Sequence, residues 1–439
     1  MIAKGKPQSS SEKEQTRSKN NITAFTAIYS YHRRVCIIVI FILILIVYSH
    51  YDTTTTAPMQ TKKHQKSSEG SNHLRSIFLP YIYEFESKEV PLVRTTIHGV
   101  DIEMPIDTGS TGLLIGAPVL PDIDPTQGTP AYHYLTSSNI LYVGRLVPLS
   151  VEFHGSEDSR AIAHVPALVV DRSYICPWYD PSNDTFDCPR GENGEEPISR
   201  DTSHIMYMGI GFSRNMPGNG QPDAIPARNP FLNIVSIDGV NTSSSTLKTG
   251  YIVSSYGVEI GLTEHNVCGF SFASLEPGVT HDEDPRDWAM VRSNFSVDGQ
   301  TGSFGYGLVD TGVSQMYLRA EEGVSVPTIW IPNPNPNGTA KKVERVRPGT
   351  QIDIDFISSK GDKVMGYGFV VGEPSTMHPA SVRPAKRTPP PFLNTGRNFL
   401  FGYSVAFDAV EGRFGFRPAR GLTASTQAAT TNSIRSLLA

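Results

Sequence analysis

The sequence predicts an all-β protein, and three observations support this fold class. Charged residues make up only 18% of the 439 residues, while 38 glycines and 33 prolines supply many turns. Short apolar runs lie between these turns, as is typical of a fold built from many short strands. No long helical period appears outside an apolar segment near the N-terminus, so we expect strands throughout the folded part.

The apolar segment from Val35 to Tyr48 carries no charge and follows a basic stretch. Its 14 residues are fewer than the about 17–25 that usually span a bilayer. Tyrosines on both sides, at 29, 31, 48 and 51, can extend the span into the interfaces. The excess of Lys and Arg before the segment predicts that the N-terminus is cytoplasmic.

Two topologies remain open for this segment. The basic stretch before it is 34 residues long, and no small-x-small cleavage site follows closely, which favours an uncleaved anchor. We therefore expect a cytoplasmic basic tail (1–34), a transmembrane signal anchor (35–51) and a single-pass type II membrane protein of the secretory pathway. A cleaved signal, and hence a secreted protein, is the alternative.

Two further segments have the composition of solvated chain. Residues 52–78 are rich in Thr, Ser, Lys and His and predict a stalk or linker. Residues 421–439 are rich in Ser, Thr and Ala and predict a disordered tail, without the long apolar end of a lipid-anchor signal. The folded part is therefore expected between residues 79 and 420.

The tripeptide Asp-Thr-Gly occurs twice, beginning at Asp107 and at Asp310. Apolar residues before each Asp predict the end of a buried strand, the Gly allows a sharp turn, and an apolar strand resumes beyond it. The two aspartates are 310 − 107 = 203 residues apart, which suits one lobe per motif, since a domain holds about 100–200 residues. We expect an N-terminal lobe at 79–250 and a C-terminal lobe at 251–420.

Two carboxylates on matching turns point to acid–base chemistry. If the turns meet, like charges about 3 Å apart cannot both ionise, so one proton is shared. The ionised carboxylate can draw a proton from a water, while the protonated one donates to the carbonyl oxygen under attack. Asp107 and Asp310 are the candidate catalytic residues. The groups expected to support them lie in the same turns: Thr108, Gly109, Ser110, Thr311, Gly312 and Ser314.

With these motifs in place, the chain resembles the pepsin-like aspartic protease family over about residues 79 to 420. Five further segments are similar to strands and to one helix of that family, in the family's order: Leu92 to Gly116, Tyr207 to Phe212, Asn229 to Asn233, Trp288 to Gly299 and Phe399 to Pro418. The resemblance implies a bilobal fold and an aspartic-type endopeptidase that works at acidic pH without a cofactor or metal. It also implies a peptide or protein substrate in the cleft between the lobes.

The chain departs from the family at three positions. The family's flap carries Tyr followed by Gly-Thr-Gly, and no such string occurs here; Tyr142 is our candidate for the flap residue among Tyr132, Tyr134 and Tyr142. Leu114 stands where Trp commonly supports the flap tyrosine, and Val313 stands where a hydroxyl usually follows the second Asp-Thr-Gly. A catalytically silent, membrane-tethered peptide-binding or wall-associated protein of the same fold is therefore the alternative function.

Cysteine and sequon usage agrees with a secretory protein. Cys36 lies in the apolar segment, and Cys176 and Cys188 bracket a short polar loop, so we expect a disulfide between these two. Cys268 is then the odd cysteine and is expected to be buried. Glycosylation sequons lie at Asn183, Asn241, Asn294 and Asn337.

Other classes of function have little support in the sequence. A net charge of −5 and a pI near 6.2 give no sign of a nucleic-acid partner, which would need a basic patch. The histidines at 98, 204, 265 and 281 lack metal-ligand spacing, and no serine nucleophile elbow or phosphate loop competes with the aspartates. A half-sized lobe that must dimerise is excluded by the second motif, so we expect a monomer.

Overall fold

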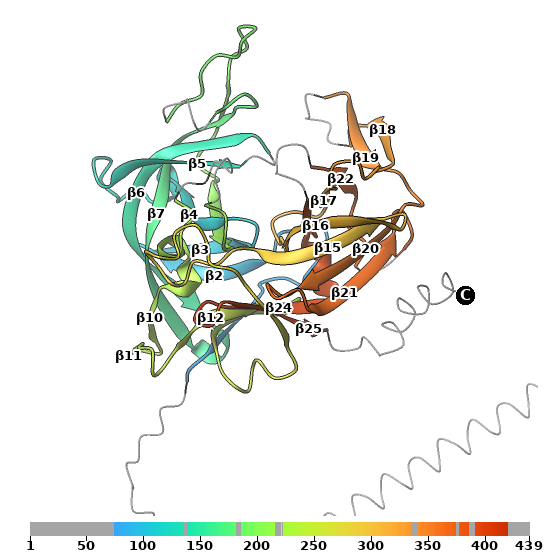
Figure 1. The fold of residues 1–439 in the computed structure, drawn as a ribbon. Helices are drawn as coiled ribbons and strands as arrows, with labels where there is room; N and C mark the ends of the chain where they lie inside the picture. The colour runs from blue at the N-terminus through green and yellow to red at the C-terminus, as the bar shows by residue number, and fades with distance from the viewer. Residues whose placement is uncertain are drawn as a thin grey trace, which may run out of the picture. The chain divides into compact units, whose positions relative to one another are not determined.

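The computed structural model describes residues 74–135, 138–180, 186–215, 221, 223–334, 340–374, 377–385 and 391–419. Within them the chain forms 25 strands and five 3-10 helices, with no α-helix (Figure 1). The prediction of an all-β fold is confirmed. The expected anchor (35–51), the basic tail and the C-terminal tail lie outside the described residues, and no helix in the described part is long and apolar enough to cross a membrane.

A ten-stranded sheet carries the first Asp-Thr-Gly turn. Its order is β11 (Val240–Asn241), β10 (Ile234–Ile237), β7 (Arg160–Ile175), β4 (Thr111–Gly116), β9 (Met206–Ile210), β3 (Val100–Asp107), β2 (Leu92–Ile97), β6 (Ile140–His154) and β5 (Thr129–Leu135), and β8 (Ile198–Arg200) pairs with β7. The hairpin from β2 to β3 turns at His98 and Gly99, which both have positive φ, as a tight two-residue hairpin requires. Strand β3 then ends at Asp107, and β4 leads away from the turn.

A seven-stranded sheet carries the second turn. Its order is β21 (Lys363–Val370), β20 (Gln351–Ile357), β15 (Val291–Val297), β16 (Gln300–Leu308), β23 (Phe392–Asn394), β17 (Met316–Arg319) and β22 (Val382–Pro384). The hairpin from β15 to β16 turns at Asp298 and Gly299, again with positive φ at both residues. Strand β16 then leads into Asp310, and β17 leads away from it.

The two turns are closed in the same way. Strand β9 lies between β3 and β4, parallel to the first and antiparallel to the second. Strand β23 lies between β16 and β17 with the same two orientations. Gly209 in β9 passes directly against the first turn, because a Cβ there would lie 2.5 Å from the Ser110 hydroxyl oxygen. Each half of the chain thus builds the same support for its aspartate.

A six-stranded sheet combines strands from both halves. Its order is β1 (Ile77–Pro80), β13 (Gly257–Leu262), β12 (Lys248–Val253), β24 (Tyr403–Asp408), β25 (Arg413–Pro418) and β14 (Ser271–Ser274). Strands β18 (Thr328–Pro332) and β19 (Lys342–Val346) form a separate pair. The 3-10 helices are η1 (Ala117–Val119), η2 (Ser156–Asp158), η3 (Pro226–Arg228), η4 (Pro230–Leu232) and η5 (Arg397–Phe401).

One apolar core connects the three large sheets. It includes Ile106 before the first turn, Phe356 in β20 and Phe407 in β24, each buried. Phe212, just after β9, stacks on Phe407 with ring centres 4.0 Å apart and planes nearly parallel. The floor under the two Asp-Thr-Gly turns is therefore rigidly packed aromatic and aliphatic side chains.

Three expectations need correction. The ordered fold begins before residue 79, because β1 starts at Ile77 and the Arg75 amide already donates to the Thr246 carbonyl oxygen at 2.7 Å. The boundary expected between 250 and 251 falls inside β12, which pairs with β24, so the two halves are not separate there. Cys268 is free and exposed rather than buried, because it lies in the turn after β13, next to Gly269 with φ +79°.

Candidate active site

Asp107 and Asp310 meet at the centre of the described fold. Both side chains are buried, with 3% and 7% of their surface exposed, and their carboxyl groups hydrogen-bond to one another. Each carboxyl also lies against the glycine of the opposite motif. A Cβ at Gly109 would be 2.3 Å from the Asp310 carboxyl carbon, and one at Gly312 would be 2.5 Å from an Asp107 carboxyl oxygen. Glycine is therefore required at both positions for the carboxyls to approach.

This pairing changes the proton affinity of Asp107. Burial, then the negative charge of Asp310 and the hydrogen bond to it, raise the pKa of Asp107 well above its usual value. Hydrogen bonds from the Gly109 amide and the Ser110 hydroxyl lower the pKa but do not cancel that rise. One of the two carboxyls therefore holds a proton at pH values where an ordinary aspartate has lost it.

The oxygens of the two carboxyls are held by similar but unequal donors. Asp107 accepts from the Gly109 amide at 2.6 Å and from the Ser110 hydroxyl at 2.9 Å. Asp310 accepts from the Gly312 amide at 2.8 Å, and its other oxygen accepts from the Asn394 side-chain amide at 2.6 Å. A side chain in β23 thus replaces the hydroxyl that Val313 cannot supply.

One group that was expected to support the carboxyls does not reach them, and one group that does support them was not expected. The Ser314 hydroxyl donates to the Gln315 side chain at 3.4 Å, so it does not reach the carboxyls. Asn394, which holds Asp310, was missed by the sequence reasoning. The only signal was the absent hydroxyl at Val313, and nothing in the sequence indicates that a residue 84 positions along the chain fills the gap.

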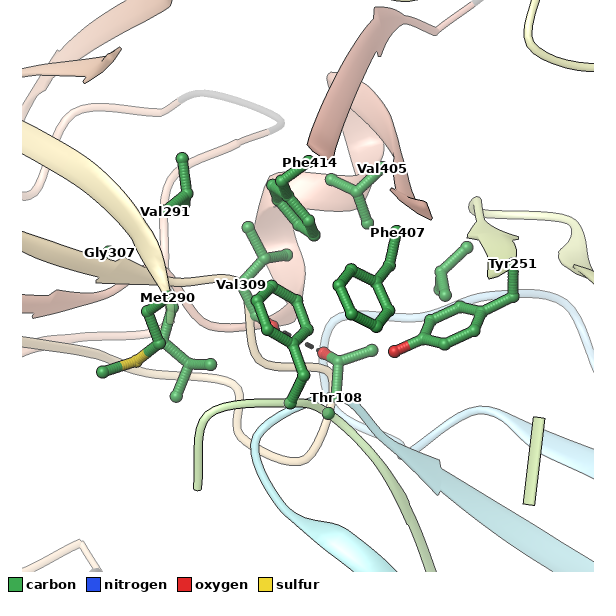
Figure 2. A pocket seen from close by; sticks show the side chains of 13 residues that line it. Thr108, Tyr251, Met290, Val291, Gly307, Val309, Val405, Phe407 and Phe414 are labelled. Carbon is green, nitrogen blue, oxygen red and sulfur yellow. Dashed lines mark hydrogen bonds between the residues drawn. The ribbon is translucent and has the colours of Figure 1, made fainter. Parts of the chain in front are cut away.

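The two turns are locked together by a reciprocal pair of threonines. The Thr108 hydroxyl donates to the Val309 carbonyl oxygen at 2.6 Å, the bond drawn dashed in Figure 2, and accepts from the Thr311 amide at 3.0 Å. The Thr311 hydroxyl donates to the Ile106 carbonyl oxygen at 2.7 Å and accepts from the Thr108 amide at 3.0 Å. Four hydrogen bonds across the junction fix the separation of the carboxyls.

Below the threonines lies a small apolar cavity of about 20 Å³ (Figure 2). Its walls come from both halves of the chain: Thr108, Tyr251, Met290, Val291, Val309, Val405, Phe407 and Phe414 are among them. This cavity is far too small for a substrate, since it holds about the volume of one water.

The carboxyls themselves open into a larger cavity of about 460 Å³. Residues from both Asp-Thr-Gly turns and from strands of both halves line it: Asp107, Gly109, Leu135, Ser138, Asn139, Tyr207, Arg214, Gln221, Leu308, Asp310, Gly312, Val313, Tyr317, Pro384, Ala385, Phe392 and Asn394. The volume is within the range of small-molecule or peptide side-chain sites.

The hairpin of β5 and β6 reaches this cavity with its tip. Leu135, Ser138 and Asn139 line the cavity there, while the candidate Tyr142 does not. The Tyr142 side chain is 7% exposed and packs in a cluster with Leu114 on the inner side of the hairpin. The hairpin occupies the place expected for a flap, and the prediction that Tyr142 closes over the cavity is wrong. Leu135 lies on the same face as Tyr142 but two pairs nearer the tip, so the residue brought to the cavity is Leu135.

The outer side of the same hairpin is covered by the disulfide loop. Cys176 and Cys188 are bonded, which confirms the predicted pairing. Tyr134 in β5 packs against Tyr179 of the loop with ring centres 4.9 Å apart, and its hydroxyl donates to the Cys176 carbonyl oxygen at 3.0 Å. The hairpin is therefore held between the core and the loop.

Two arginines lie close to the carboxyls, of which Arg397 is buried and Arg214 half-buried. The Arg397 side chain donates to the Gly312 carbonyl oxygen at 2.9 Å, and burial lowers its pKa while the charges of Asp310 and Asp107 raise it. Arg214 lines the larger cavity, and its pKa is shifted by the same causes in the same directions. Positive charge beside the carboxyls stabilises the state in which one of them is ionised.

The remaining site predictions fall into two groups. Asn241 lies on the exposed strand β11 and Asn294 is half-buried in β15, so both stay glycosylation predictions, while Asn183 and Asn337 lie outside the described residues. In the described part, no cluster of three or more His, Cys, Asp or Glu side chains has the arrangement of a metal site.

Comparison with known proteins adds no relative to this picture. No protein-family model matches the chain, and no curated protein matches it.

Proposed function

We propose that this chain is an aspartic-type endopeptidase of the pepsin-like, bilobal kind, with Asp107 and Asp310 as its catalytic pair. The observation that carries the proposal is the pair of hydrogen-bonded, buried carboxyls that open into one cavity from two equivalent turns. The equivalent closure of the turns by β9 and β23 supports two related lobes. A peptide held in the cavity would have its scissile bond above the carboxyls.

The hydrogen-bond donors suggest which carboxyl holds the proton. The Asn394 amide can only donate to Asp310, so it favours an unprotonated oxygen there. The Ser110 hydroxyl beside Asp107 can donate or accept, and therefore tolerates a protonated carboxyl. The raised pKa of Asp107 agrees with this assignment.

The reaction then proceeds by general acid–base catalysis. Asp310 takes a proton from a water that attacks the peptide carbonyl carbon, and Asp107 donates its proton to the carbonyl oxygen. The tetrahedral intermediate collapses when Asp310 passes the proton it took from the water to the peptide nitrogen, which leaves as the amine, while Asp107 takes back a hydroxyl proton and the C=O bond re-forms. No covalent bond to the protein forms in this sequence.

The test is hydrolysis of a broad peptide library at acidic pH by the full chain and by two variants. Asp107→Asn and Asp310→Asn should each lower kcat/KM by at least about 10³-fold, because each removes one member of the acid–base pair. Thermal unfolding of the variants should remain cooperative, since Asn preserves the shape of the side chain. Cleavage by the Asn variants at the rate of the wild type would rule out the proposed mechanism.

A catalytically silent peptide-binding protein of the same fold is the second candidate. The observation in its favour is at the flap tip, where Leu135 rather than a tyrosine lines the cavity. Under that function the wild type would bind statine-containing peptides but hydrolyse nothing in the library.

The location of the protein is proposed on the sequence alone. We propose a type II membrane protein anchored by residues 35–51, with residues 79–420 in the lumen or outside the cell. The disulfide is compatible with an oxidising compartment. Glycosylation at Asn241 and Asn294 in cells would support this topology, and a mature N-terminus between residues 49 and 79 would support secretion instead.

A further inference from the structure

The described arginines differ in whether they form an ion pair. Several do, as Arg286 does with Asp284 and Arg292 with Glu276, both at 2.7 Å. Arg214, Arg383 and the buried Arg397 are among the described arginines with no carboxylate within ion-pair distance. A buried cation without a partner is costly, so an unpaired arginine at a cavity wall calls for an anion.

Arg214 lies on the wall beside the catalytic pair. It follows β9 by four residues, and its guanidinium donates to the sulfur of Met290 at 3.6 Å. A thioether sulfur is a weak acceptor, and the Arg214 Nε is buried without a hydrogen-bond partner. The guanidinium therefore keeps donor capacity for a ligand in the cavity.

Arg383 lies beside Tyr317, which lines the cavity, in a row of side chains across three strands. In the register of the sheet, Arg383 in β22 pairs with Tyr317 in β17, and Tyr317 pairs with Asn394 in β23. Directly paired residues project from the same face of a sheet, and Tyr317 and Asn394 both line the cavity. The Arg383 guanidinium carbon is 5.9 Å from the centre of the Tyr317 ring, and its Nε is buried without a partner.

The local charge balance favours an acidic ligand. The catalytic pair carries one negative charge when it shares one proton, whereas Arg214, Arg397 and Arg383 carry three positive charges. Arg345 is a fourth cation near Arg383: burial lowers the pKa of Arg345, and the charge of Arg383 lowers it further. The cavity thus has an excess of positive charge in its working state.

We propose that this cavity selects peptides with a carboxylate near the scissile bond, bound by Arg214 at the cavity wall and assisted by Arg383 beside Tyr317. The proposal rests on the proposed peptidase function of the same site. Guanidinium groups bind carboxylates through two parallel hydrogen bonds, which gives both strength and geometry. The carboxylate belongs either to an acidic side chain or to the C-terminus of a short peptide.

The test uses uncleavable statine peptides in matched pairs, with Glu or Gln placed in turn at three positions on each side of the statine. Binding to the full chain is measured by calorimetry at about pH 5.5, where a Glu side chain with a pKa of about 4.3 is ionised. The best Glu peptide should bind at least about tenfold more tightly than its Gln partner, the usual worth of a charged hydrogen-bonded pair. A second set with amidated C-termini separates the two sources of carboxylate.

The variants identify the arginine responsible. Arg214→Gln and Arg383→Gln should each reduce the Glu/Gln binding ratio, and the double variant should bring it to about one. Arg214→Lys should keep part of the preference, because the charge remains while the two-pronged geometry is lost. Arg190→Gln is the matched control and should leave the ratio unchanged, because Arg190 forms an exposed ion pair with Glu196 and does not line the cavity.

The outcomes separate this inference from the proposed function. Equal binding of Glu and Gln peptides with free and with amidated C-termini, or a preference that survives in the double variant, would overturn the inference even if peptides are cleaved. A preference for Glu over Gln peptides that is lost in the arginine variants would support the inference even if unmodified peptides are never hydrolysed. The protein would then be a binder of acidic peptides rather than a peptidase.

Discussion

At the level of single residues, the catalytic pair differs at one donor. Ser110 holds Asp107 with a hydroxyl, whereas Asn394 holds Asp310 with an amide from another strand. The two turns are otherwise equivalent, since a glycine amide two residues along holds each carboxyl. The difference in the donors to the two carboxyls is therefore confined to one side chain on each.

We predict that Asn394→Leu lowers kcat/KM by roughly 10- to 100-fold, because Asp310 loses a charge-assisted hydrogen bond worth about 1.5–3 kcal/mol. The acidic limb of the pH–rate profile should move to higher pH, since the ionised state of the pair is less stabilised. Adding Val313→Thr to this variant should restore part of the rate, because a hydroxyl then follows the second Asp-Thr-Gly as Ser110 follows the first. A profile unchanged in Asn394→Leu would show that the amide plays no part.

Residue-scale prediction from the sequence succeeded where the site is local in the chain. Asp107 and Asp310 each sit in a turn that its own neighbours specify, so the motifs located both. Asn394 and Leu135 reach the cavity through strand pairing, and Arg214 reaches it from the loop after β9; no short motif encodes these placements. Ser314 failed for the complementary reason, because the chain turns its hydroxyl towards Gln315.

At the level of elements, the hairpin of β5 and β6 lies between two apolar layers. Its inner face packs with Leu114 and its outer face with Tyr179 of the disulfide loop. Because the tip residues Leu135, Ser138 and Asn139 line the cavity, the loop controls how firmly that wall is held.

We predict that the free energy of unfolding of the double variant Cys176→Ser/Cys188→Ser is about 2–4 kcal/mol lower than that of the wild type, since the disulfide no longer closes the loop between residues 12 positions apart. Hydrogen exchange of the β5 amides should accelerate, and KM should rise more than kcat falls, because the cavity wall is looser in the free protein. Cys268→Ser, at the exposed free thiol, is the control and should change none of these quantities. If hydrogen exchange in β5 is unaltered in the double variant, the disulfide loop does not stabilise the hairpin.

The positions of the strands were predicted more successfully from the sequence than the way in which the strands pair. The Gly-containing turns at 98–99 and 298–299 mark hairpins that are read directly from the sequence. The segment from Asn229 to Asn233 resembled a helix but forms only the single turn η4, capped by Asn229. The first two residues of β1, Ile77 and Phe78, were assigned to the stalk because a short four-residue strand has no distinct pattern until β13 lies beside it.

At the level of the whole molecule, the buried carboxyls make stability depend on pH. The pKa of Asp107 is raised well above its unfolded value of about 3.9, so the folded state keeps a proton that the unfolded chain releases. The corresponding stability is complete below about pH 4 and is lost as the pH rises through the folded value. His133 acts in the opposite sense, because burial and the charges of Arg228 and Arg214 lower its pKa to about 3.

We predict that the free energy of unfolding of the wild type, measured relative to Asp107→Asn, falls as the pH rises from about 4 towards 8, by about 1.4 kcal/mol for each pH unit in which only the unfolded chain has lost the Asp107 proton. Asp107→Asn should therefore be the more stable protein at neutral pH. The stability that depends on neutral His133 is lost below about pH 6.5 and is common to both proteins. Denaturant unfolding at each pH measures the difference, and parallel curves for the two proteins would contradict the prediction.

The six-stranded sheet has a consequence for synthesis of the chain on the ribosome. Val253 in β12 pairs with Val405 in β24, so 405 − 253 = 152 residues must still be translated before β12 gains this neighbour. Until then the nascent chain exposes the apolar edge of β12, and unpaired edges of this kind invite pairing with other chains. The strands β1, β13 and β12 can pair during synthesis, whereas the half of the sheet formed by β24 and β25 is added only when the last part of the chain has been made.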